Sequence, residues 1–156
     1  MNYNQKLEEF LGISLEDYPS TAYSLIEARA RRYSRFPEFF SYRYLDEPIF
    51  GMFTKIEVVT LEYVNNRHMK LIDEDFNVSK LDVVKKLIDG LVDIYGADDN
   101  RNLWLSEDEE EEIILNQWKG RSWDFPKNEE IRAITISLEE NNFRLCIHEM
   151  GNLIDF

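Results

Sequence analysis

The sequence is short of the residues that most often carry catalysis, metal binding and covalent cross-links. It has one cysteine, Cys146, and two histidines, His68 and His148, among 156 residues. A single cysteine excludes an internal disulfide and a metal site built from thiolates alone. No nucleotide-binding loop, zinc-protease motif or serine-hydrolase motif occurs. We therefore expect no cofactor and no metal site, and we identify no catalytic residue. The scarcity of these residues favours a protein that is not an enzyme.

Long apolar runs are missing as well. The longest are a few residues, far below the roughly 20 that a membrane-spanning helix needs. The first residues lack the apolar core of a secretory signal, and no Gly/Ser/Pro-rich linker divides the chain. We expect a soluble, cytoplasmic protein that does not bind membranes. Its length fits a single domain over 1–156, with a helical segment over 1–37 and a sheet-and-helix core over 48–156.

Basic charge is scarce relative to acidic charge. Eighteen Lys and Arg face 31 Asp and Glu, which gives a net charge of −13, and six acids form an unbroken run over 107–112. The resulting field repels phosphate backbones, so DNA binding is not expected. Successive side chains on a helix point about 100° apart, so the run does not converge on one metal ion. It indicates the start of a helix at Ser106 or a solvated charged face.

Two segments have the pattern of β-hairpins. Residues 54–64 are rich in β-branched side chains, and the Asn65-Asn66 turn leads into a partner strand that ends at about residue 72. Residues 131–138 alternate between apolar and polar, turn at 140–142 and return. The predicted hairpins cover about 54–72 and 131–149.

The remaining periodicity is helical. Residues 80–95 have apolar side chains at three- and four-residue spacing, and Gly96 follows as a stop. Two further helices are predicted near the amino terminus, one before Gly12 and one from about 22 to 36. The predicted fold class is α+β, with an antiparallel sheet of two hairpins packed against the helix over 80–95.

Tryptophan and arginine are the residues most enriched in binding hot spots. The candidate binding residues are Trp104, Trp118, Arg121 and Trp123, together with Arg31 and Arg35 on one face of the second predicted helix. For Trp118 and Trp123 the alternative is that they are core residues, because aromatic side chains also dominate cores. Arg121 would then pair with a local acid.

Two other patterns suggest chemistry and have simpler explanations. The stretch from Tyr23 to Tyr44 mixes arginines with aromatics, as single-stranded nucleic-acid sites do, but an amphipathic helix explains it equally and the acidic field opposes nucleic acid. Cys146 lies two residues from His148 on a predicted strand. A thiol–imidazole pair would require His68 beside Cys146 across the sheet; otherwise Cys146 is a small packed thiol.

Three functions stay open. The first is a small acidic, non-catalytic interaction module for another protein, a basic one, comparable in size and charge to inhibitors and immunity proteins that neutralise basic toxins. The second is a ligand-binding domain or enzyme with a pocket between helix and sheet, drawing on the three tryptophans, Arg121 and the two histidines. The third is a structural protein that self-associates as a homo-oligomer and buries the aromatic stretch over 36–44 between copies.

Overall fold

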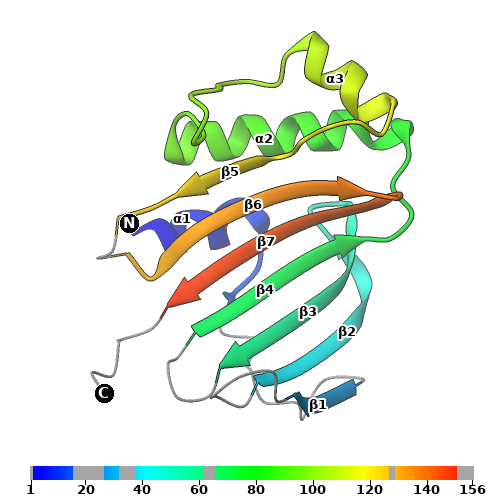
Figure 1. Ribbon diagram of the computed structural model, residues 1–156. Helices are drawn as coiled ribbons and strands as arrows, with labels where there is room; N and C mark the ends of the chain where they lie inside the picture. The colour runs from blue at the N-terminus through cyan, green and yellow to red at the C-terminus, as the bar shows by residue number, and fades with distance from the viewer. Residues whose placement is uncertain (1, 16–26, 32–37, 62–65, 127–128, 151–156) are drawn as a thin grey trace.

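The protein is built on a single antiparallel sheet. The computed structural model describes residues 2–15, 27–31, 38–61, 66–126 and 129–150. In these residues seven strands form the sheet in the order β1-β2-β3-β4-β7-β6-β5, and helices α1 and α2 pack against one of its faces (Figure 1). No helix in the described ranges is both long enough and apolar enough to cross a membrane.

The strands are β1 (Glu27–Arg31), β2 (Glu38–Ile49), β3 (Phe53–Leu61), β4 (Asn66–Asp73), β5 (Arg121–Asp124), β6 (Ile131–Glu139) and β7 (Asn142–Met150). The helices are α1 (Tyr3–Leu11), α2 (Leu81–Tyr95) and α3 (Glu107–Ile114), and a 3-10 turn, η2 (Val78–Lys80), precedes α2.

The α+β class with an antiparallel sheet is confirmed. Strands β3 and β4 pair where the first hairpin was predicted, and β6 and β7 pair where the second was predicted. The two pairs join through β4 and β7, with Lys70 opposite Cys146. The sheet is nevertheless not built from two hairpins alone, because β1, β2 and β5 extend it on both sides.

The amino-terminal third differs from the prediction. Residues 27–31, expected inside a second helix, form strand β1 and pair with β2, so the prediction of two amino-terminal helices over 1–37 was wrong. Pairing with a strand edge overrides helical spacing, which is a weak local preference. Arg31 therefore lies on a strand, and Arg35 lies outside the described residues.

Strand β2 was also missed. The sequence from 39 to 53 reads as irregular because Pro48 interrupts it, yet residues 38–49 form the longest of the described strands. The register between β2 and β3 shifts between Tyr44 and Ile49. Proline is tolerated in a strand at such an irregularity, where no ladder hydrogen bond is required of it.

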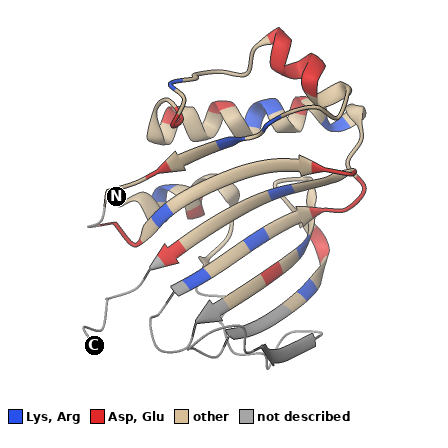
Figure 2. Ribbon diagram, viewed as in Figure 1, with Lys and Arg blue, Asp and Glu red and all other residues tan. Residues whose placement is uncertain are grey.

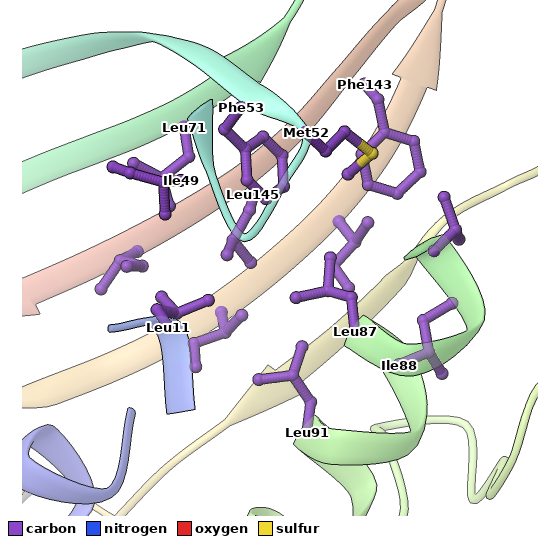
Figure 3. Packing of buried hydrophobic residues seen from close by; sticks show 14 of the residues in the cluster. Leu11, Ile49, Met52, Phe53, Leu71, Leu87, Ile88, Leu91, Phe143 and Leu145 are labelled. Carbon is purple, nitrogen blue, oxygen red and sulfur yellow. The ribbon is translucent and has the colours of Figure 1, made fainter. Parts of the chain in front are cut away.

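The core lies between the sheet and its helices. Of the stripe predicted for α2, Val84, Leu87, Ile88 and Leu91 are buried, whereas Ile94 and Tyr95 are half-buried. Val92, which was not part of the predicted stripe, is buried as well. Figure 3 shows Leu87 and Leu91 extending from α2 toward the sheet, where Leu145 lies. Phe143, Leu145 and Ile147 alternate along β7 and are each fully buried. Each such side chain contributes roughly 1.5 to 3 kcal/mol on burial, so this interface is the main stabilising layer.

Helix α1 is stabilised by capping interactions at its ends and by packing against α2. Asn2 and Gln5 form a capping box, and Gly12 ends the helix in the left-handed conformation that glycine adopts without strain. The ring of Phe10 lies so close to Gly90 of α2 that a Cβ there would be 2.1 Å from it. Gly90, unfavourable in a helix interior, is therefore explained by close packing.

Replacing Gly90 with alanine tests this contact. The added methyl group displaces the Phe10 ring, which also packs on Phe50 with ring centroids 5.0 Å apart. We expect Gly90→Ala to lower the free energy of unfolding by about 1 kcal/mol, because overpacking outweighs the gain in helix propensity. On a Phe10→Ala background the same change should become stabilising. Urea unfolding of the four proteins measures both effects, and a stabilising Gly90→Ala in the parent chain contradicts the packing account.

Candidate functional site

A buried arginine connects β5 to the segment that precedes it. The Arg121 side chain is 1% exposed. It forms a two-pronged ion pair with Glu109 of α3, with Nε to Oε2 at 3.1 Å and Nη2 to Oε1 at 2.5 Å, and lies 3.6 Å from Asp98. It also donates to the main-chain oxygens of Leu103 and Trp104. One guanidinium thus binds α3 and the loop before it to the sheet edge.

Glu109 is the acid of the 107–112 run that turns inward. Its Oε2 accepts hydrogen bonds from Arg121 and from the indole N–H of Trp118, at 3.1 Å each. Burial by itself raises the pKa of Glu109, but these hydrogen bonds and the charge of Arg121 outweigh burial and hold that pKa below its ordinary value. Glu107, Asp108 and Glu111 stay exposed.

The acidic run therefore serves as a helix start, as predicted. Ser106 caps α3 by accepting a hydrogen bond from the Glu109 N–H at 3.2 Å. The helix ends at Ile114, and residues 103–105 before it form an irregular loop. In the ribbon of Figure 2, acidic residues are concentrated along α3 and several basic residues lie along the central strands.

The predicted binding tryptophans fall into two groups. Trp118 and Trp123 are buried; Trp118 stacks on Phe143, and the Trp123 indole N–H donates to the Gly96 carbonyl at 3.0 Å. Trp104, by contrast, is 55% exposed. Trp118, Arg121 and Trp123 thus make internal contacts, whereas Trp104 presents its ring to solvent.

Exposed apolar side chains concentrate around α3. Leu103 and Trp104 precede the helix, and Ile114 and Leu115 end it. In the ranges whose side chains are described, the other large exposed apolar side chains are Tyr44 and Val78. We call the following residues the α3 surface: Leu103, Trp104, Glu107, Asp108, Glu111, Ile114 and Leu115. Exposed apolar side chains bordered by charge are typical of interaction sites.

The histidines and the cysteine do not form the dyad that the sequence left open. His68 and His148 lie opposite each other on β4 and β7 and stack with ring centroids 4.0 Å apart. Burial lowers the pKa of both imidazoles, and cationic neighbours add to the effect. Cys146 faces Lys70 instead, and burial raises the pKa of its thiol. A half-buried thiol with a raised pKa is a poor nucleophile, because less of it is thiolate.

The hollows described on the surface lie elsewhere. One lies beside α1 and the ends of β4 and β7, and another lies near the β6–β7 turn. Neither is lined by the tryptophans, Arg121, His68 or His148, the residues named for a pocket between helix and sheet. Within the described ranges, no three His, Cys, Asp or Glu side chains are arranged to hold a metal ion.

Sequence reasoning missed the acids that matter to this geometry. Asp98 and Glu109 become partners of Arg121 only through the fold, because they lie 23 and 12 residues before it in the sequence. Nothing in the sequence distinguishes Glu109 from the five acids beside it. Glu109 points inward because of its angular position around the α3 axis and because β5 places the Arg121 guanidinium beside it.

Glu109→Gln tests the buried ion pair, and Glu111→Gln, an exposed acid two residues further along the same helix, is its matched control. Losing one partner leaves the Arg121 charge incompletely compensated. We expect Glu109→Gln to cost about 1 to 3 kcal/mol in the free energy of unfolding, and Glu111→Gln to change it by less than about 0.5 kcal/mol. Chemical denaturation measures both, and equal effects would contradict the assigned role of Glu109.

The same pair predicts a pH dependence. Because the folded-state pKa of Glu109 lies below its ordinary value of 4.5, its contribution is complete above that value and is lost as the pH falls through the folded-state pKa. We expect the gap in unfolding free energy between the parent chain and Glu109→Gln to be constant from about pH 7 to 6 and to narrow toward about pH 3. Denaturation curves across this range measure the gap. A gap that does not change with pH would rule out titration of Glu109 as its source.

The α3 surface combines exposed apolar side chains with exposed carboxylates. The buried Arg121, which is not part of this surface, bonds the main chain of Leu103 and Trp104 and the carboxylate of Glu109. These features define the candidate site from its own residues. Comparison of the chain with models of protein families, with curated proteins and with solved structures found no match.

Proposed function

We propose that this protein is a small acidic, non-catalytic interaction module that binds a basic protein through the α3 surface. The observation that carries the proposal is the exposed ring of Trp104 beside a helix whose first four residues are all acidic. Tryptophan in a binding surface supplies a large contact area, and the carboxylates select the sign of the partner's charge.

The loop and helix that form the α3 surface are held in place by internal hydrogen bonds, which supports the same proposal. Arg121 bonds the main-chain oxygens of Leu103 and Trp104 and the carboxylate of Glu109. The loop that carries Trp104 and the helix that carries the acids are therefore held by one buried group. A surface that is ordered before binding loses less conformational entropy on association, so more of its contact energy appears as affinity.

The charge supports a role in fast recognition. A net charge of −13 attracts a basic protein over several ångströms and accelerates its association, an effect that salt screens. A partner that fits has an apolar recess for Trp104 ringed by Lys and Arg. A basic nuclease or toxin held inactive by an acidic inhibitor is the class of complex that this chemistry suggests, in the cytoplasm and without DNA binding by this chain.

Affinity capture from the native host, followed by kinetics with the purified partner, tests the proposal. Trp104→Ala should weaken the complex by tenfold or more, as loss of a hot-spot residue does. Tyr44→Ala is the matched control, since Tyr44 is an aromatic residue 51% exposed on a different element, against 55% for Trp104. It should leave the affinity unchanged.

The salt dependence of the association rate is a second test of the proposal. The association rate should fall as salt rises from about 50 to 500 mM, and the double variant Glu107→Lys/Glu111→Lys should slow association further at low salt. An association rate insensitive to salt, or an equal loss of affinity in Tyr44→Ala and Trp104→Ala, overturns the proposal.

A further inference from the structure

Two histidine side chains meet at the middle of the sheet. His68 of β4 lies directly opposite His148 of β7, and their rings stack with centroids 4.0 Å apart and planes inclined by 27°. In the described sheet, the pairing of β4 with β7 connects strands β1 to β4 with strands β5 to β7. Figure 1 shows β4 and β7 side by side at the centre of the sheet. The stack therefore lies at the junction of the two halves of the sheet.

The stack lies on the face of the sheet that points away from α1 and α2. Neighbouring residues on a strand point to opposite faces, and Met69 and Ile147, which adjoin the two histidines, are fully buried in the core. Both histidines are half-buried. Because each is partly exposed, protons can exchange with the rings while the chain stays folded.

The surroundings of the stack favour its neutral form. Burial lowers the pKa of both imidazoles. The charges of His148 and Lys70 lower the pKa of His68 further, and the charge of Arg132 lowers the pKa of His148. Both rings are therefore mainly neutral at pH 7. The side chains that face or adjoin the rings, in the described parts of the neighbouring strands, are Val59 and Glu57 of β3, Lys70 of β4, Cys146 of β7, and Arg132 and Ala133 of β6. Glu57, the acid of this group, forms an ion pair with Lys55 at 3.2 Å.

The two rings cannot bind protons independently. Neutral imidazoles pack on each other as stacked aromatic rings do. Two imidazolium ions at 4.0 Å repel each other, so a proton on one ring opposes a proton on the other. The charge of His148 is one of the causes that lower the pKa of His68. His148 therefore takes the first proton on acidification, and the second proton, on His68, acts against the stack.

We propose that the His68–His148 stack is an acid-sensitive contact at the middle of the sheet. The neutral rings pack on each other and support the pairing of β4 with β7, whereas protonation of both rings separates them and weakens that pairing. Histidine is the side chain whose charge ordinarily changes between about pH 5 and 8, and histidine clusters at interfaces act as pH sensors. Neither histidine belongs to the α3 surface, so this contact is independent of the proposed function.

NMR titration of the imidazole C–H signals tests the coupling between the rings. The chain has two histidines, so a variant of one leaves a single imidazole to follow. In the parent chain we expect both titration midpoints below the ordinary value of 6.5. His148→Gln removes a charge beside His68 and should raise the His68 midpoint by about 0.5 or more. Lys85→Gln, which removes an exposed cation from α2, is the control and should leave both midpoints unchanged. An unchanged His68 midpoint in His148→Gln overturns the proposal.

The pH dependence of unfolding tests the link to stability. Because the folded-state pKa of each imidazole lies below its ordinary value of 6.5, the unfolded chain takes up protons first. The contribution of the stack is therefore complete above that value and is lost as the pH falls through the folded-state pKa. Between about pH 7.5 and 5.0, the unfolding equilibrium constant of the parent chain should rise roughly tenfold more than that of His68→Gln/His148→Gln. Urea denaturation measures both, and carboxylates common to the two proteins cancel in the comparison.

Separation of the rings has a readout of its own in the parent chain. Nuclear Overhauser contacts between the two imidazoles should be present above both titration midpoints and lost below the lower one, while the amide signals of α2 show that the chain is still folded. This measurement decides the proposal even where the double variant does not fold. Ring contacts that persist below the lower midpoint, or the same pH dependence of unfolding in the parent chain and the folded double variant, overturn it.

Discussion

The structure around α3 depends on one requirement: the positive charge of the buried Arg121 guanidinium must be neutralised by neighbouring groups. Arg121 enters the interior at the start of β5, the strand at the edge of the sheet, where its side chain has almost no contact with solvent. Glu109, Asp98 and two main-chain oxygens surround it. These groups lie within residues 98–109, a stretch of irregular chain and short helix, so neutralising one charge fixes the position of the whole stretch.

That requirement also divides the acidic run by role. Glu109 points inward and stabilises the fold, whereas its exposed neighbours add charge to the surface without an internal partner. The apolar side chains at both ends of α3 are exposed, whereas Ile113 within the helix enters the core. A short helix pinned at one acid thus presents charge and apolar area together.

The accuracy of prediction from the sequence followed the strength of local periodicity. The alternating apolar and polar residues of the hairpins and the apolar stripe of α2 could be predicted, because a period of two or of 3.6 residues repeats over eight or more positions. Strand β2 could not be predicted from the sequence, because Pro48 lies at a register shift that no sequence pattern indicates. In β1, spacing compatible with a helix was overridden by pairing with β2. Trp104 and Trp118 are alike in sequence terms, and only packing separates the exposed ring from the buried one.

The sequence by itself determined the α+β class, the two central hairpins, the stripe of α2, the capped start of α3 and the excess of acid. Each of these depends on neighbours within a few residues, where spacing and residue type decide the outcome. The tertiary structure decided the order of the strands, the partners of Arg121 and the exposure of Trp104. These depend on contacts between residues distant in sequence, which form only when the sheet brings its strands together.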